Sequence, residues 1–349
     1  MVRGKLVFCG RNKLIIAFLF RVKSNELIIM NYFEKIKNAY RILKMDNSRL
    51  YLAIYYDNVG LTKKFLKKGI DISSNIFNGV NPISVAVMRE SNDVLEYLIS
   101  LGANINLPNK TGIFPIHIAC RQKFIPALEC LIRSNVDVNV KDINGVTPVM
   151  SVIIYNSLSD FSEPPVLDLS MVCIYSLLSS GADINIRNGD GESPLEIAIS
   201  AKLYPIIEIF LLYGAKITIS ESDNKNDLWF SINQKDYKLF EMFIEYGVDI
   251  EMRIYKGRTP LMVAVEYNQI EMVKLLISKG VELNSLCNDG YSALLYAVVS
   301  NNYLIVKTLV DAGADLNILY DESKSTVLQY AKQNGFEDIY NFLKSAGAK

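Results

Sequence analysis

The chain has 349 residues, of which 50% are hydrophobic and 21% are charged, a composition that excludes an intrinsically disordered protein. Its 37 Lys and Arg balance 37 Asp and Glu, and a formal net charge of zero argues against strong global attraction to nucleic acid. One His and five Cys, without a Cys-x-x-Cys pair, leave little material for a histidine-based catalytic site, a zinc site or a disulfide framework.

The amino-terminal part of the chain is basic. Residues 1–70 contain 15 Lys or Arg and 4 Asp or Glu, a balance of +11, while the other 22 basic and 33 acidic residues leave −11. We interpret residues 1–29 as a poorly ordered leader or, if translation begins at Met30, as a non-native start. Residues 30–47 are predicted to form a cap helix with an apolar face of Phe33, Ile36, Tyr40 and Leu43. Alternatively, this basic region binds an anionic lipid or RNA surface.

No segment of the sequence has the length and apolar character of a membrane span. The best apolar run, Leu14 to Phe20, has seven residues, whereas a spanning helix needs about 20. The run is also a poor secretory signal, because no small-residue cleavage site follows it. We therefore expect a cytoplasmic protein whose Cys residues are reduced.

From residue 48 onward the sequence repeats itself. Motifs that begin at Gly102, Gly181 and Gly313 read Gly-Ala-Asn-Ile-Asn, Gly-Ala-Asp-Ile-Asn and Gly-Ala-Asp-Leu-Asn, and Asn135 stands where another Gly is expected. The equivalent positions are 69, 102, 135, 181, 214, 247, 280, 313 and 347, and all steps are 33 or 34 residues except one of 46. A small residue lies 16 positions before most of them. The single long step indicates an insertion of 13 residues at about 156–168.

The pattern resembles the ankyrin repeat, in which G-x-T-P-L-H-L-A precedes a helix pair and G-A-D-x-N follows it. The best match runs from Gly257 through Thr259-Pro260-Leu261 to Ala264. The resemblance covers residues 48–349 in about nine repeats. It implies an all-α repeat fold, a solenoid of helix-turn-helix units linked by short β-hairpin-like turns. Thr or Ser before Pro supplies an N-cap, and the Gly can take the left-handed conformation that ends a helix.

The resemblance also implies structural roles for residues that could otherwise suggest chemistry. His117 falls on the His of the pattern, which in this family hydrogen-bonds the backbone of adjoining turns. Cys120 and Cys130 fall on the two helices of one repeat and are expected in the core. The stretch from Asn188 to Gly191 lies at a turn between repeats and lacks the Lys of a phosphate-binding loop.

Two segments depart from the repeat pattern. The insertion at 156–168 is interpreted as a tolerated surface loop or as a docking element, and Pro164-Pro165 favours an extended conformation within it. In the repeat at 220–252, Asn226-Asp227-Leu228 replaces Thr-Pro-Leu and Trp229 replaces His. Two interpretations stay open: the sequence of this repeat has drifted while its helix packing is intact, or the repeat is a weak joint in the stack of repeats.

The turns between repeats and the ends of the first helices are expected to carry exposed side chains, Ile76 among them. The resemblance implies that these line a concave groove that binds a partner protein, and Tyr and Arg are the residue types most frequent at interface hot spots. The residues predicted to contact the partner are Phe77, Arg89, Lys110, Arg121, Tyr255, Lys256, Arg258, Tyr267, Asn288, Tyr291 and Tyr320.

We therefore predict a non-catalytic, monomeric scaffold or adaptor that binds an unidentified protein and uses no cofactor, metal or DNA. A second interpretation is a host-directed effector or inhibitor from an intracellular parasite, symbiont or virus, delivered into a host cell. It rests on the richness in Ile, Asn, Lys and Tyr, which is typical of AT-rich genomes. The third is the anionic-surface binder with its basic amino-terminal region.

Overall fold

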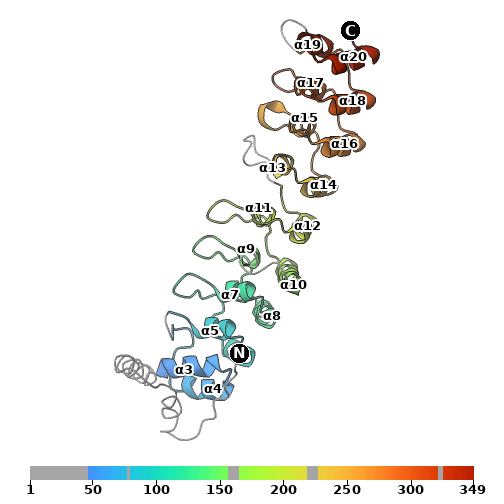
Figure 1. Ribbon diagram of the computed structural model, residues 1–349. Coiled ribbons are helices and arrows are strands. Elements are labelled where there is room, and N and C mark those ends of the chain that lie inside the picture. The colour runs from blue at the N-terminus through green and yellow to red at the C-terminus, as the bar shows by residue number, and fades with distance from the viewer. Residues whose placement is uncertain (1–45, 77–78, 156–164, 218–226, 321–324) are drawn as a thin grey trace, which may run out of the picture. The chain divides into compact units, whose positions relative to one another are not determined.

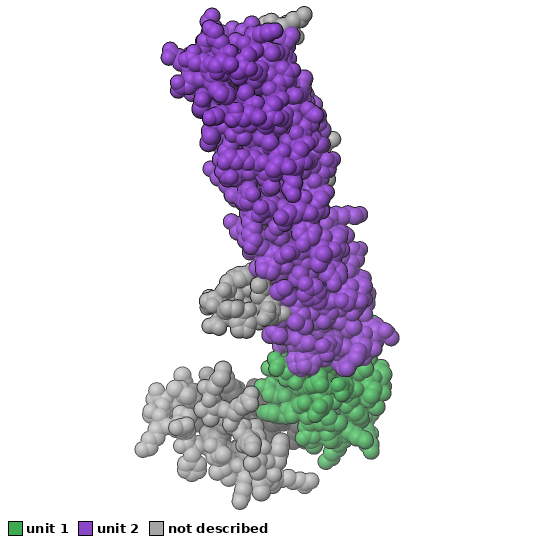
Figure 2. Space-filling model, turned by 90° about the vertical axis from the view of Figure 1, so that its right-hand side faces the viewer, with its two compact units in different colours: residues 1–115 green, residues 116–349 purple. Residues whose placement is uncertain are grey.

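The computed structural model describes residues 46–349 except 77–78, 156–164, 218–226 and 321–324, without the side chains of residues 165–168 and Tyr255. The chain divides into two compact units, Met1–Pro115 and Ile116–Lys349, which are coloured separately in Figure 2. The predicted leader lies outside the described residues, as does the cap helix except for its last two residues. A single repeat domain over 48–349 stays a prediction.

The described residues form 18 α-helices arranged as nine consecutive pairs, and each pair is one repeat (Figure 1). The first helices of the pairs are α3 (Asp46–Tyr55), α5 (Pro82–Met88), α7 (Pro115–Gln122), α9 (Pro148–Ile154), α11 (Pro194–Ser200), α13 (Asp227–Asn233), α15 (Pro260–Glu266), α17 (Ala293–Val299) and α19 (Val327–Gln333). The second helices are α4 (Val59–Leu66), α6 (Asn92–Ser100), α8 (Ile125–Arg133), α10 (Pro165–Ser179), α12 (Tyr204–Leu212), α14 (Tyr237–Glu245), α16 (Ile270–Ser278), α18 (Tyr303–Asp311) and α20 (Glu337–Ser345). A 3₁₀ turn, η2 (Tyr255–Gly257), precedes α15.

Four of the first helices, α5, α9, α11 and α15, begin where the sequence supplies a capping side chain followed by Pro. The Asn81 Oδ1 accepts a hydrogen bond of 2.8 Å from the Ser84 N–H, and the Ser193 and Thr259 hydroxyls cap α11 and α15 in the same way. Pro occupies the first helical position after each of these caps, where its missing N–H costs nothing. The N-cap role predicted for this part of the pattern is confirmed.

The second helices end at the repeat marker because its residue takes the left-handed conformation. Gly102 has φ of 82°, and Asn135, which replaces Gly, has φ of 59°. A further left-handed residue lies between the two helices of most described repeats, and here non-glycine residues predominate. These residues are Asp57, Glu90, Lys123, Lys202, Lys235, Asn268, Asn301 and, in the last repeat, Gly335.

Within each unit, helices pack on their counterparts in the next repeat. In unit 2, α9 packs on α11, while α15 packs on both α13 and α17; α14, α16, α18 and α20 likewise pack in sequence. Figure 1 shows the odd-numbered and even-numbered helices of this unit as two rows, with the inter-repeat turns projecting from the odd-numbered row. Fully buried apolar side chains such as Leu128, Phe210 and Phe243 fill the space between helices.

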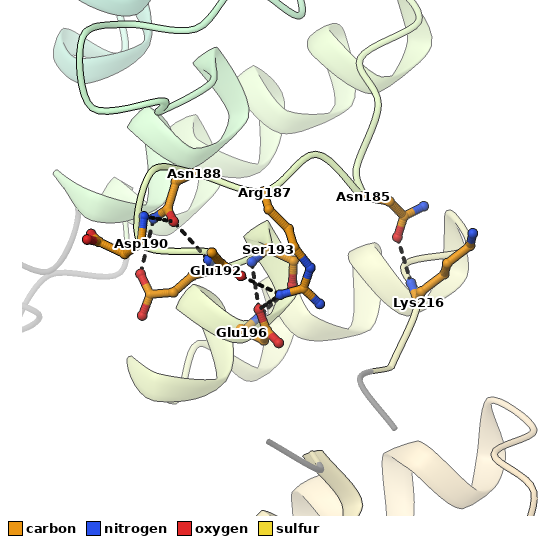
Figure 3. Close-up of polar contacts among 9 residues, drawn as sticks. Asn185, Arg187, Asn188, Asp190, Glu192, Ser193, Glu196 and Lys216 are labelled. Atoms are coloured by element: carbon orange, nitrogen blue, oxygen red, sulfur yellow. Dashed lines mark hydrogen bonds and ion pairs between the residues drawn. The ribbon is translucent and has the colours of Figure 1, made fainter. Parts of the chain in front are cut away.

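In several repeats of unit 2, an Asn four residues after the repeat marker links the repeat to the next one. The Asn185 Oδ1 accepts a hydrogen bond of 2.8 Å from the Lys216 N–H (Figure 3), Asn284 accepts from the Asp315 N–H, and Asn317 accepts from the Lys349 N–H. The marker therefore satisfies a backbone donor that lies one repeat further along the chain.

The turns between repeats are tight, and no strand is present among the described residues. The expected resemblance to β-hairpins therefore holds only for the hydrogen bonds within each turn. The Asn188 N–H donates to the Glu192 carbonyl at 2.9 Å, and Asn188 Oδ1 accepts from the N–H groups of Asp190 and Glu192 (Figure 3). One isolated antiparallel bridge joins Ile254 and Arg258. The assignment of Asn188 to Gly191 as an inter-repeat turn is confirmed.

The two irregular segments behave differently from each other. Residues 156–164 of the insertion, Pro164 among them, lie outside the described residues. Pro165 begins α10, so the extended conformation expected for this residue is wrong. The physical reason is that Pro fits the first turn of a helix. In the degenerate repeat, α13 and α14 are both present and bury Leu228, Leu239 and Phe240, which supports drift with intact packing.

Candidate functional site

Aromatic side chains gather on the turns and first helices of the last two repeats. We call Tyr291, Tyr296, Tyr320 and Tyr330 the tyrosine cluster. The Tyr291 ring contacts those of Tyr296 and Tyr320 with centroids 5.7 and 6.1 Å apart, and the Tyr320 ring lies 6.1 Å from that of Tyr330. All three pairs are edge-to-face, which is a favourable geometry for aromatic rings. The four side chains are half-buried, so each ring keeps an exposed part.

A charged pair adjoins the tyrosine cluster. Arg258, in the turn before α15, forms an ion pair with Glu266 at the end of that helix, and 12% of the Arg258 side chain is exposed. The Tyr296 hydroxyl lies 3.6 Å from the Cys287 sulfur. Burial, together with this contact, raises the pKa of Tyr296 well above its ordinary value, and Arg258 and Glu266 act on it in opposite directions. The phenol therefore stays neutral and remains a hydrogen-bonding group.

Backbone contacts between adjacent turns hold this surface. The Asn288 N–H donates to the Lys256 carbonyl at 2.9 Å. Gly257 has φ of 68°, and a Cβ there would collide with the Asn288 side chain. The positive φ favours glycine at this position, and a larger residue would also require the Asn288 side chain to shift. Lys256 and Asn288 are themselves exposed, on neighbouring turns.

Further from the cluster, Tyr267 at the end of α15 contacts Trp229 of α13 with ring centroids 6.2 Å apart. Both side chains are half-buried. We define the turn face of unit 2 as Trp229, Lys256, Arg258, Glu266, Tyr267, Asn288 and the tyrosine cluster. It draws on the turns and first helices of four successive repeats.

Arg121 lies elsewhere in unit 2 and has a local structural role. Its guanidinium pairs with the Asp142 carboxylate at 3.1 Å and lies 4.3 Å from the centre of the Tyr155 ring. The Asp142 side chain is 1% exposed and also accepts hydrogen bonds from the N–H groups of Asn144 and Val146. Arg121 therefore neutralises a buried carboxylate that shapes a turn.

In unit 1 the predicted contact residues are separate. Arg89, at the end of α5, is exposed, donates to the Tyr51 hydroxyl at 3.2 Å and lies 4.4 Å from the centre of the Tyr55 ring. Lys110 is exposed at a turn, where its N–H donates to the Gly79 carbonyl. Phe77 falls outside the described residues, and Tyr255 is described only by its backbone in η2.

Two turn residues differ from the expectation of exposure. Ile76 is 5% exposed and therefore buried, and the Arg258 side chain is largely covered. The turns are stacked against one another, so an apolar or paired side chain at the base of a turn packs beneath its neighbour. Exposure holds for Lys110, Lys256 and Asn288.

The residues most often used in catalysis have structural surroundings. The His117 Nε2 lies 2.8 Å from the Val146 carbonyl oxygen in the next turn, the imidazole is fully buried, and burial lowers its pKa. The role implied for this His is confirmed. Cys120 and Cys130 are buried as expected, and burial raises the pKa of the Cys120 thiol. Among the described residues, His, Cys, Asp and Glu form no group of three or more that could hold a metal.

Sequence reasoning missed Tyr296 and Tyr330 because they lie inside helices rather than at turns. They occupy the same position in successive repeats, immediately before the small residues Ala297 and Ala331. An alignment of the repeats position by position would have found them. The pairing of Arg258 with Glu266 carries no comparable sequence signal, since it depends on how a turn folds over its own helix.

A family model for ankyrin repeats, described as three copies, matches residues 50–142, 83–162, 116–221 and 228–320. The search of curated proteins finds no match. Among the described residues, no helix combines the length and the apolar character that crossing a bilayer requires.

Proposed function

The chain belongs to the ankyrin-repeat family, and on that premise we propose that it is a non-catalytic protein that binds a partner protein through the turn face of unit 2. The proposal places the tyrosine cluster at the centre of the contact. Arg258 and Glu266 lie beside the centre, and Lys256 and Asn288 at the rim.

The single observation that carries the proposal is the chain of edge-to-face contacts in the cluster. Each ring is fixed by at least one other ring, yet each keeps an exposed part. A surface that is ordered before binding loses little side-chain entropy on association. Tyr offers a large contact area, a hydroxyl and only two rotatable side-chain angles, which is why it is frequent at hot spots.

Affinity capture with paired variants tests the proposal. The site variant carries Tyr291→Ala and Tyr320→Ala. The matched control carries Tyr175→Ala and Tyr213→Ala, which removes a similar ring pair, 6.1 Å apart, near the ends of the second helices α10 and α12. A partner retained by wild type and control but lost from the site variant supports the proposal, provided that all three proteins melt at similar temperatures.

A partner captured equally by the site variant and the wild type contradicts the proposed surface. In that case, two results together would favour the basic amino-terminal region instead: binding that weakens steeply with salt, and loss of this binding when residues 1–45 are removed. Delivery into a host cell is a separate proposal about where the protein acts, and its test is the identity of the captured partner.

A further inference from the structure

The second helices of the last two repeats form a hollow that lies apart from the turn face. Its volume is about 500 Å³, and it is lined by Tyr303 of α18 and by Asp338, Asn341, Phe342 and Ser345 of α20. The four α20 residues are spaced i, i+3, i+4 and i+7, so they share one face of the helix. In Figure 1 these helices belong to the even-numbered row, whereas the turns project from the odd-numbered row.

The hollow combines aromatic and anionic groups. The rings of Tyr303 and Phe342 meet edge-to-face with centroids 5.5 Å apart, and Tyr303 is 43% exposed. Asp338 and Asn341 are exposed on the same side of α20. Within the described part of the chain, no Lys or Arg forms an ion pair with the Asp338 carboxylate. The Ser345 hydroxyl already donates to the Phe342 carbonyl at 2.7 Å.

We propose that this hollow is a second docking site, which takes the side chain of an arginine from a partner protein. Guanidinium groups stack on aromatic faces and pair with a carboxylate through two parallel N–H groups, so one side chain can use the rings and Asp338 together. The Asn341 amide oxygen and the Tyr303 hydroxyl offer further acceptors. An acidic side chain would face Asp338 with like charge, and a purely apolar one would leave the carboxylate without a counter-ion.

The hollow is distinct from the turn face, because it lies on the second helices α18 and α20 and suits one kind of side chain. Arginine suits the hollow better than lysine, since an ammonium is a strongly hydrated point charge and cannot match both a ring face and a carboxylate in one plane.

The test uses the full chain and a blocked tripeptide, acetyl-Gly-Arg-Gly-amide, followed by chemical-shift changes of backbone amides. The same peptide with citrulline is an uncharged control of nearly equal shape, and the lysine peptide tests the choice of cation. We expect the arginine peptide to shift the amides of residues 303 and 338–345, with at least about threefold weaker binding of the other two peptides.

Two variants connect the binding to the named groups. Asp338→Asn should weaken arginine binding by about three- to fivefold, whereas Glu337→Gln, the same change of charge at the neighbouring position, should leave it within error. Tyr303→Leu should weaken it by about two- to fivefold. Equal binding of the arginine and citrulline peptides, preferred binding of lysine, or an unaltered response in Asp338→Asn overturns the proposal. The outcome is independent of the turn face, whose variants leave α18 and α20 unchanged.

Discussion

At the residue scale, the left-handed position between the two helices of a repeat is filled mostly by residues other than Gly. Lys202 has φ of 54°, and its backbone N–H donates to the Ile199 carbonyl. Gly335 fills the same position in the last repeat with φ of 71°, and a Cβ there would meet nothing within 4 Å. A side chain at residue 335 would therefore meet no clash, and the positive φ is what disfavours a residue other than Gly there.

Exchanging these residues tests that strain. Lys202→Gly should raise the free energy of unfolding by up to about 1 kcal/mol, and Gly335→Lys should lower it by about 1 kcal/mol. Urea unfolding followed by circular dichroism measures both variants against wild type. Shifts of the same sign in the two variants would show that contacts, and not the backbone angle, govern this position.

His117 is the single histidine of the chain, so its effect on the pH dependence of stability can be measured separately. Because burial lowers the pKa of His117 from its ordinary 6.5, the unfolded chain binds a proton that the folded chain does not bind. The contribution to stability is therefore complete above pH 6.5 and is lost as the pH falls toward the lowered pKa of the folded state. His117→Gln keeps a donor for Val146 but cannot titrate. Between pH 7.5 and 5.5, wild type should lose more unfolding free energy than the variant; equal losses would contradict the assignment.

At the element scale, the first helices are defined by their caps. In α11 the Glu196 N–H donates to the Ser193 hydroxyl at 3.2 Å, and the Ser193 N–H donates to the Glu196 carboxylate at 2.7 Å (Figure 3). Arg187 pairs with the same carboxylate. These two reciprocal hydrogen bonds give a partner to two backbone N–H groups, those of Ser193 and Glu196.

Ser193→Ala should lower the free energy of unfolding by about 1 kcal/mol through loss of the cap. Ser200→Ala is the matched control, because this exposed Ser lies at the other end of the same helix and the change should stay within about 0.5 kcal/mol. Calorimetry of the two variants gives the comparison. If both variants lose the same free energy of unfolding, the Ser193 cap does not contribute to the stability of α11.

The elements were largely predictable because the same local rules act in every repeat. Caps, Pro positions, left-handed Gly and the role of His117 all follow from residues within one repeat or its nearest turn. Tyr296 and Tyr330 recur at one position of successive repeats and could have been found by aligning the repeats. Their ring contacts with Tyr291 and Tyr320, and the pairing of Arg258 with Glu266, were not foreseen, since these depend on how side chains of turns and helices meet. Ile76 was misplaced for the same reason: the turn bends it inward.

At the scale of the whole molecule, stability in a repeat array comes from contacts between neighbouring repeats. The step from α12 to α14 carries a polar link. The Tyr204 hydroxyl donates to the Asp236 carboxylate at 2.7 Å, and the Lys238 ammonium lies 4.6 Å from the centre of the Tyr204 ring. Burial and this hydrogen bond raise the pKa of Tyr204 to about 12, so the phenol remains a donor at neutral pH.

Tyr204→Phe removes that link and should speed amide exchange in α13 and α14 about fivefold, equivalent to about 1 kcal/mol, with less effect in α17 and α18. Tyr237→Phe is the control, because the hydrogen bond that it removes, from the Tyr237 hydroxyl to Glu241, lies within α14. If both variants speed amide exchange in α13 and α14 equally, the stability of the step from α12 to α14 does not depend on the Tyr204 hydroxyl.

The measurement that tests the central claim most directly is site-specific photo-crosslinking. A benzoylphenylalanine placed at residue 291 or 320 should form a covalent adduct with one partner protein, and the same group at residue 175 or 213 should form none. Adducts with that partner only from residues 175 and 213, or equally from all four positions, would contradict binding through the turn face.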